Sequence, residues 1–342
     1  MTLQVAAATV FEIEPWQHER LQQSLPDLQC RAIEVPLDEK SVGEVGDASV
    51  VSIFIRSRVT RAVLERMPHV QFIATRSTGY DHIDLAACAE RGIIVSNVPT
   101  YGENTVAEHT FSLILALSRR LAVVARRTTH GDFSLRGLMG FDLRGRTLGV
   151  VGAGNIGLHV IRIGRGFGMD VLAFDARPQQ LLAEVLGFRY VPLEELLTRS
   201  DVVTLHVPYR PETHHLIDRE RLTLLKPGAL LVNTGRGALV DTVALLEALD
   251  SGKVGGAGLD VIEGEEQLME EPQLFHLPGT EDQLRHLLTG HVLATRENVI
   301  LTPHMAWYSR EALERILDTT ATNIRGFLAG APTNVIAVDQ AG

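Results

Sequence analysis

Short apolar runs alternate with amphipathic segments along the first hundred residues of the chain. The apolar runs that predict buried parallel strands are 3–10, 50–55, 70–75 and 93–98. Amphipathic segments at 15–25 and 60–67 predict helices between them. Strands that alternate with helices indicate a parallel sheet with helical crossovers. This region is expected to form a compact domain, and it contains no glycine-rich phosphate loop.

A second series of strands and helices begins near residue 147. Six apolar runs predict its strands, at 147–153, 170–175, 201–207, 229–235, 255–261 and 298–304. Helices fit between them, for example over 155–167, 193–199 and 241–250. Six parallel strands with a glycine-rich first turn favour a doubly wound dinucleotide-binding fold.

The segment 103–127 predicts one long helix. Thr105 and Glu108 have the spacing of a capping box at its start. The segment is apolar around much of its circumference, which indicates deep burial or a subunit interface. Another amphipathic helix, predicted over 309–330, brings no strands of its own, so we expect it to pack on the first domain.

These patterns predict an α/β fold with two parallel-sheet domains. A Rossmann-type dinucleotide domain at 103–304 is expected to be inserted into a flavodoxin-like substrate domain made of 1–102 and 305–342. The cleft between two such domains is the default place for an active site. A length of 342 residues agrees with this prediction, because one hydrophobic core seldom supports so many residues.

Composition argues against several classes of function. The chain is 45% hydrophobic and 22% charged, which is ordinary for a globular protein and argues against disorder. A net charge of −10 argues against a general role in binding nucleic acid or anionic membranes, although one buried arginine could still select an anionic substrate. Cys30 and Cys88 form no CxxC pair, which favours reduced core thiols over a disulfide or a metal site. The N-terminus has no basic signal region, and no apolar run approaches about 20 residues, so we expect a cytoplasmic protein without a membrane span.

Residues 152–157 read GAGNIG, a GxGxxG motif that follows an apolar strand and opens a helix, as dinucleotide binding requires. Gly152 permits the tight turn, Gly154 lets the backbone approach a pyrophosphate, and Gly157 permits close packing of the helix on the strand. Asp175 ends the next strand, 18 residues after Gly157, where it can accept hydrogen bonds from ribose hydroxyls. This arrangement predicts NAD rather than NADP, although Arg177 would weaken that preference. The alternative is a structural glycine turn beside an unrelated aspartate.

Two residues that follow later strands carry candidate chemistry. Arg236 lies in NTGRGALVD (233–241), at the sheet edge where α/β proteins bind ligands. Its guanidinium could hold a carboxylate with two parallel hydrogen bonds, or it could be an ordinary loop arginine. His304 lies in ILTPHMAWYS and is a natural proton donor near neutral pH, although a histidine at a strand end is more often structural.

A carboxylate near His304 would keep its imidazole protonated and fix the orientation of the ring. The local sequence leaves three candidates for this partner, Glu263, Glu265 and Glu266. His214 and His215, in PETHHLID, lie in a predicted polar loop, and we interpret them as solvated or helix-capping residues.

Five motifs occur in an order and at a spacing that resemble those of the D-isomer-specific 2-hydroxyacid dehydrogenase family. They are VVGAGNIG, HVPYRPETHHLID, LLKPGALLVNTGRGALVD, GAGLDV and NVILTPHMAWYS. The segments 75–85 and 97–120 also match, so the resemblance covers nearly the whole chain. It implies an inserted NAD domain and a homodimer that forms through this domain, chiefly by the helix at about 105–120.

The resemblance also assigns roles to matching positions. It implies that Arg236 binds the substrate carboxylate, that His304 exchanges a proton with the substrate oxygen, and that Glu265 keeps His304 protonated. Residues at positions that contact NAD in the family are Asn155, Ile156, Val207, Pro208, Thr213, Thr234, Gly235 and Asp260. Residues implied at the substrate are Thr78 and Gly79, through their backbone N–H groups, and Tyr101, Trp307 and Phe54, which border the substrate side chain.

Details of the motifs narrow the substrate. The long separation of Glu265 from His304 and the HMAWYS segment resemble D-lactate dehydrogenases more than formate, glycerate or phosphoglycerate enzymes. Thr78 stands where phosphite dehydrogenases carry lysine, and Gly235 stands where Ser or Ala is more frequent. We therefore predict metal-independent reduction of a small 2-keto acid to a D-2-hydroxy acid, with pyruvate and D-lactate as the expected pair. The alternatives are a dehydrogenase for bulkier 2-keto acids and an NAD-responsive, corepressor-like binding protein.

Overall fold

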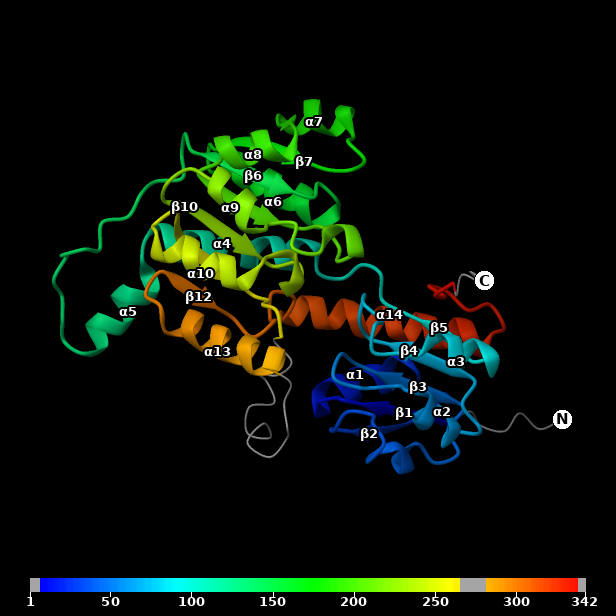
Figure 1. Ribbon diagram of the computed structural model, residues 1–342. Helices are drawn as coiled ribbons and strands as arrows, with labels where there is room; N and C mark the ends of the chain where they lie inside the picture. Colours follow the sequence, from blue (N-terminus) through cyan, green and yellow to red (C-terminus); the bar gives the residue numbers. More distant parts are fainter. Residues whose placement is uncertain (1–6, 265–280, 338–342) are drawn as a thin grey trace. The chain divides into compact units, whose positions relative to one another are not determined.

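The computed structural model describes residues 7–264 and 281–337, apart from the side chains of 281–287, and the chain divides into two compact units (Figure 1). The first unit consists of 1–101 and 309–342, and the second consists of 102–308. The second unit is therefore an insertion into the first.

The first unit is built on a five-stranded sheet in the order β2-β1-β3-β4-β5. Its strands are β1 (Ala7–Phe11), β2 (Gln29–Ile33), β3 (Val50–Ile53), β4 (Phe72–Thr75) and β5 (Ile94–Ser96). Every neighbouring pair is parallel. This order is the flavodoxin-like one, in which the direction of winding reverses between β1 and β3.

Helices cover both faces of this sheet. They are α1 (Pro15–Ser24), α2 (Arg61–Glu65), α3 (Leu85–Glu90) and α14 (Arg310–Leu328), with a 3-10 helix η1 (Val42–Val45). Successive residues of a strand point to opposite faces, so Val50 packs in one cluster with Leu21 and Leu317, whereas Val51 packs in another cluster with Val63. The C-terminal helix α14 thus packs on the first unit, as its sequence predicts.

The second unit is built on a seven-stranded sheet in the order β12-β11-β10-β9-β6-β7-β8. Its strands are β6 (Thr147–Val151), β7 (Asp170–Phe174), β8 (Arg189–Tyr190), β9 (Val202–Leu205), β10 (Ala229–Asn233), β11 (Val254–Leu259) and β12 (Val299–Leu301). All pairs are parallel, and winding reverses between β6 and β9. This is the doubly wound dinucleotide-binding order with one strand added beside β11. The predicted α/β fold with two parallel sheets is confirmed.

Apolar clusters lie on both faces of this second sheet. Its helices are α4 (Glu103–Ser118), α5 (Leu121–Thr129), α6 (Asn155–Gly166), α7 (Gln180–Leu186), α8 (Leu193–Arg199), α9 (Arg219–Leu224), α10 (Thr242–Asp250) and α13 (Glu281–Thr295), with 3-10 turns η2 (Pro211–Thr213) and η3 (Gly237–Leu239). Val150 packs with Ile114 of α4 and Ile161 of α6, and Val151 packs on the other face with Leu245 of α10. Seven of the 16 residues of α4 are buried and only Glu108 and Ser112 are exposed, which agrees with its broad apolar circumference.

Two local predictions for the long helix are wrong. The segment 103–127 forms two helices, because Arg120 adopts a left-handed backbone conformation (φ 52°) and the Ser118 carbonyl accepts the N–H of Phe141. The segment around Gly140 passes close to the end of α4, and only glycine fits at this position, since a Cβ atom there would lie 2.2 Å from the Ser118 oxygen. The helix also begins at Glu103, with Gly102 as its N-cap, so Thr105 is not a capping residue.

The strands β2 and β8 were not predicted. The sequence QCRAI of β2 mixes polar and apolar residues because this strand lies at an edge of its sheet, and β8 has only two residues. Cys30 and Cys88 are both buried, and burial raises the pKa of each thiol to about 11. No helix among the described residues is long and apolar enough to cross a membrane.

Candidate functional site

The glycine motif forms a tight turn between β6 and α6. Gly152 has φ 96°, and a Cβ atom there would lie 2.8 Å from the carbonyl group of His206. A Cβ atom on Gly157 would lie 1.9 Å from the Gly152 carbonyl oxygen, so the helix can approach the strand only with glycine at this position. Gly154 is the N-cap of α6 and has no atom within 4 Å of its Cβ direction among the described residues.

Asp175 follows β7 and joins this turn. Its Oδ2 accepts the N–H of Ala153 at 2.8 Å, and its Oδ1 accepts the N–H of Arg177 at 2.8 Å. Each carboxylate oxygen keeps a lone pair for a further donor, such as a ribose hydroxyl. The first turn of α6 has no acidic residue and no side-chain cap, so its N–H groups can receive an anion. The turn, the helix end and the carboxylate together fit a dinucleotide.

The other predicted cofactor residues follow the central strands of the same sheet at its carboxyl edge. Asn155 and Ile156 open α6, Val207 and Pro208 follow β9, Thr213 ends η2, Thr234 and Gly235 follow β10, and Asp260 follows β11. The Thr213 hydroxyl closes its turn by accepting the N–H of Arg210 at 2.7 Å and donating to the Pro208 carbonyl at 2.9 Å. Thr234 is buried and its hydroxyl lies 3.0 Å from that of Thr110 on α4.

The loop that carries Arg236 is shaped by a buried asparagine. The Asn233 side chain accepts the N–H of Gly235 at 3.0 Å and donates to the carbonyl of Arg236 at 2.9 Å. The guanidinium of Arg236 is exposed and donates to the Gly235 carbonyl at 2.8 Å. A Cβ atom on Gly237 would lie 2.2 Å from the carbonyl of Ile262, so this loop is packed closely against the chain that leaves β11.

Asp260 holds the loop that carries His304. It is 1% exposed, and its Oδ1 accepts the hydroxyl of Thr302 at 2.5 Å and the N–H of Met305 at 2.9 Å, while its Oδ2 accepts the N–H of Ala306 at 2.8 Å. The backbone N–H of His304 donates to the Asp260 carbonyl at 2.9 Å. Four contacts thus fix a loop in which His304 has a left-handed conformation (φ 50°).

The same network reaches back to β10 and to α4. The N–H of Asp260 donates to the carbonyl of Asn233 at 2.9 Å, which links the two loops. His109 of α4 lies 3.1 Å from the Thr302 hydroxyl and 3.5 Å from the Asp260 carboxylate. Sequence reasoning missed Asn233, His109 and Thr302, although Asn233 lies in the strand predicted at 229–235 and begins the motif that contains Arg236.

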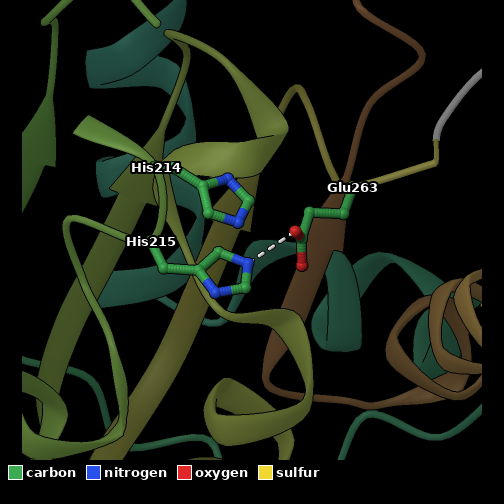
Figure 2. A group of neighbouring side chains, drawn as sticks. All are labelled: His214, His215 and Glu263. Atoms are coloured by element: carbon green, nitrogen blue, oxygen red, sulfur yellow. Dashed lines mark hydrogen bonds and ion pairs between the residues drawn. The ribbon is translucent and has the colours of Figure 1, made fainter. Parts of the chain in front are cut away.

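Of the three glutamates proposed as partners of His304, only Glu263 lies within the described residues. Its Oε1 is 2.6 Å from Nε2 of His215 (Figure 2). Its Oε2 accepts the hydroxyl of Thr242 at 2.9 Å. The interpretation of His215 as a solvated or capping residue is therefore wrong, because a carboxylate 48 residues further along the chain binds its ring. Glu265 and Glu266 lie outside the described residues.

The predicted substrate residues divide between the two units. Phe54 follows β3, Thr78 and Gly79 follow β4, and Tyr101 is the last residue before the second unit. The Thr78 hydroxyl donates to the Val98 carbonyl at 2.8 Å. Trp307 belongs to the second unit, where its indole N–H donates to the His304 carbonyl at 3.0 Å.

A buried glutamate and a buried arginine that sequence reasoning missed support the Phe54 loop. Glu12, which follows β1 with φ 52°, accepts the N–H groups of Phe54, Arg56 and Ser57 at 2.9 to 3.1 Å. Arg76 donates to the Glu12 carbonyl at 2.8 Å and lies over the Phe54 ring at 5.5 Å. Burial lowers the pKa of Arg76 to about 10, so it stays charged at neutral pH. These groups lie at the winding reversal of the first sheet, where α/β sheets bind ligands.

Comparisons with known proteins agree with this geometry. The family model described as the D-isomer specific 2-hydroxyacid dehydrogenase NAD-binding domain matches residues 111–306. A D-lactate dehydrogenase of Escherichia coli K12 is 39% identical over 296 residues, which cover 86% of this chain and 88% of the relative. A 2-hydroxyacid dehydrogenase homolog of Haemophilus influenzae is 41% identical over 296 residues, covering 86% and 87%. The crystal structure of a D-lactate dehydrogenase from Aquifex aeolicus, complexed with NAD and lactic acid, has a TM-score of 0.82 at 39% identity and covers 95% of this chain and 96% of that one.

Proposed function

Since the chain belongs to the D-isomer-specific 2-hydroxyacid dehydrogenase family, it is an NAD-dependent D-2-hydroxyacid dehydrogenase, and we propose that it interconverts pyruvate and D-lactate. The similarity to D-lactate dehydrogenases of two bacteria supports this substrate pair. Alternative substrates are bulkier 2-keto acids, and an alternative role is that of an NAD-responsive binding protein.

The observation that carries the proposed mechanism is that three residues lie in the loops that follow three adjacent strands. Arg236, Asp260 and His304 follow β10, β11 and β12, which are neighbours in the sheet, and hydrogen bonds join their loops. Such an array presents a cation and an imidazole at one sheet edge. A 2-keto acid offers a carboxylate and a carbonyl oxygen to just such a pair.

Each residue then has a definite task. Arg236 binds the substrate carboxylate with two parallel hydrogen bonds and so orients the keto group. His304 donates a proton to the carbonyl oxygen during reduction and removes it from the hydroxyl during oxidation. Glu265 keeps His304 protonated before reduction. When bound, the nicotinamide supplies or accepts the hydride at C2.

Residues of the glycine turn and of the first unit complete the proposal. We assign cofactor binding to Asp175, the three glycines of the turn and the other predicted contacts described above. We assign the substrate carboxylate to the backbone N–H groups of Thr78 and Gly79, and the substrate side chain to Phe54, Tyr101 and Trp307. Pairing of Phe54 with Arg76 gives that ring a fixed position.

The first test is oxidation of NADH by the purified protein, followed at about 340 nm, with pyruvate, phenylpyruvate, 2-ketoisocaproate and glyoxylate. Fast turnover of pyruvate to D-lactate, and not L-lactate, is expected. H304A should mainly lower kcat and R236A should mainly raise KM for the keto acid. Turnover of the larger acids alone would replace pyruvate as the proposed substrate and leave the proposed mechanism unchanged. Tight NADH binding with no turnover of any acid would favour the binding protein.

We also propose a homodimer that forms through the second unit, chiefly by the helix at about 105–120 as the resemblance implies, and another segment of this unit supports the proposal because it presents large apolar side chains to solvent. Phe133, Leu135 and Met139 are 78%, 85% and 90% exposed, in a stretch without helix or strand that extends with α5 away from the sheet (Figure 1). Exposed apolar groups gathered in one segment indicate an interface. The expected partner is a second copy of the chain.

The dimer is tested by light scattering coupled to size exclusion. We expect twice the chain mass of 37.5 kDa for the wild type, and dissociation at low protein concentration for the double variant F133S and M139S. L181S is the matched control, because Leu181 is 72% exposed outside this segment. A wild-type protein with the mass of one chain, or a double variant with an unchanged mass, would contradict the proposed interface.

A further inference from the structure

Three side chains outside the proposed catalytic residues bring metal-binding atoms together in the second unit. His214 and His215 lie in the loop between η2 and α9, and Glu263 lies in the turn after β11 (Figure 2). One ligand atom from each residue lies within 4.8 Å of the other two. The two imidazole rings stack with their centroids 4.0 Å apart and their planes at 19°. Both rings present a nitrogen to the side on which the carboxylate lies.

An unusual backbone conformation puts both rings on the same side of the chain. Consecutive side chains of an extended chain point in opposite directions. His214 is extended (φ −61°, ψ 127°), whereas His215 is left-handed (φ 48°), and this reversal turns its ring under that of His214. The N–H of His215 donates to the Ala238 carbonyl at 2.8 Å, which holds the residue in this state. Backbone conformations that few residues adopt gather at functional sites.

The carboxylate is fixed and the first imidazole is accessible. Oε2 of Glu263 is bound by the hydroxyl of Thr242 at 2.9 Å, which leaves Oε1 directed to His215 at 2.6 Å. The side chains of Glu263 and His215 are 11% and 33% exposed. His214 is exposed, and Tyr209 meets its ring edge-on at 6.0 Å between centroids. An ion can therefore reach the site from solvent.

We propose that His214, His215 and Glu263 form a site for a divalent transition-metal ion of the zinc class. Two imidazole nitrogens and one carboxylate oxygen are the donors that Zn²⁺ prefers, whereas Mg²⁺ and Ca²⁺ prefer oxygen alone. Ligands at about 2.0 to 2.2 Å from an ion lie at most about 4.4 Å apart. The in-plane lone pairs of two stacked, nearly parallel rings do not converge on one point, so the exposed His214 ring must rotate out of the stack to direct a nitrogen at the ion that His215 and Glu263 bind. The ion takes the place of the proton shared by His215 and Glu263, and its fourth position is open to water.

The proposal goes beyond the dehydrogenase function and does not depend on it, because the test measures metal binding. Protein treated with a chelator is titrated with Zn²⁺ in competition with a chromogenic chelator. We expect one equivalent per chain with micromolar affinity, and binding that is at least about tenfold weaker in H214A. The exposed position of His214 makes a folding defect in H214A easy to exclude by thermal unfolding. H69A is the matched control, because His69 is exposed in the first unit, and it should bind as the wild type does.

A second measurement reports the ligands directly. Co²⁺ in a tetrahedral site with nitrogen and oxygen ligands absorbs visible light strongly, and that band should appear with the wild type and H69A but not with H214A. Equal Zn²⁺ affinity of H214A and the wild type would overturn the proposal, since the ion would then bind elsewhere. Absence of binding at Zn²⁺ concentrations up to about 1 mM would overturn it as well.

Discussion

Replacement of Asp260 by asparagine tests whether one buried carboxylate holds the loop that carries His304. The carboxylate accepts three hydrogen bonds, from the Thr302 hydroxyl, the Met305 N–H and the Ala306 N–H, at 2.5 to 2.9 Å. The variant D260N has one acceptor oxygen in place of two. Its NH₂ group must face either the Ala306 N–H or the donors on the other side, so at least one buried N–H loses its partner.

The structure gives the size of the effect. Hydrogen bonds to a charged group contribute about 1.5 to 3 kcal/mol each, against about 1 kcal/mol for a neutral pair. Losing one such bond costs about 1.5 to 3 kcal/mol, and making the other two neutral costs about 0.5 to 2 kcal/mol each, so the free energy of unfolding should fall by about 2.5 to 7 kcal/mol. The relaxed loop also displaces the imidazole, and a misplacement of about 1 Å lowers kcat by about a hundredfold.

Chemical denaturation and steady-state kinetics measure the two effects. D218N is the matched control, because Asp218 caps α9 by accepting the N–H of Arg221, and asparagine is as good an N-cap as aspartate. We expect D218N to change the free energy of unfolding by a few tenths of a kcal/mol and to leave kcat unchanged. The reasoning would be refuted by a D260N protein with wild-type kcat and a free energy of unfolding within about 1 kcal/mol of the wild type.

Three further predictions concern charge, protonation and close packing. R236K keeps the charge but not the two-pronged geometry, so KM for the keto acid should rise about 10- to 100-fold while KM for NADH stays constant in steady-state assays. Burial lowers the pKa of His206 to about 3, so between pH 6.5 and about 3 the unfolded chain binds a proton that the folded chain does not. The free energy of unfolding should therefore fall with decreasing pH, by about 2 kcal/mol from this residue at pH 5, and denaturation of H206Q should lack that part of the slope. G157A would bring a Cβ atom within 1.9 Å of the Gly152 carbonyl oxygen, so NADH affinity in a fluorescence titration should fall at least about tenfold, whereas an unchanged affinity would contradict the geometry of the turn.

The sequence predicts what depends on neighbouring residues. Buried parallel strands are runs of apolar residues, so they can be found locally. The need for glycine at position 157 is also local, because the atom that a Cβ there would strike, the carbonyl oxygen of Gly152, belongs to the same short motif. The alternation of strands and helices predicts both sheets. The two strands that it misses are a two-residue strand and an edge strand, in which burial on one face leaves little apolar pattern.

Contacts between distant segments could not be predicted in this way. The bond of His215 to Glu263 spans 48 residues, and that of Glu12 to Ser57 spans 45. The predicted long helix ends at α4 because the distant segment around Gly140 packs against the helix end, and the sequence of the helix itself does not indicate this contact. The position of Asp260 at the end of a strand can be predicted from the sequence. Its hydrogen bonds to the loop that carries His304 cannot, because they depend on the pairing of β11 with β12.

The hydrogen bonds of the Glu12 carboxylate bear on the redesign of the substrate specificity that we propose for the Phe54 loop. Because this carboxylate binds the backbone N–H groups of Phe54, Arg56 and Ser57 in the turn after β3, the path of that turn is set by a residue outside it. Ile55 and Arg56 are exposed on this path. Substitutions at these two positions, and at Phe54, change side chains while the anchored backbone stays in place. A library of substitutions at residues 54–56 would therefore vary the side chains of this turn while its backbone path stays the same. An insertion of one residue would instead move the backbone N–H groups away from the Glu12 carboxylate and change that path.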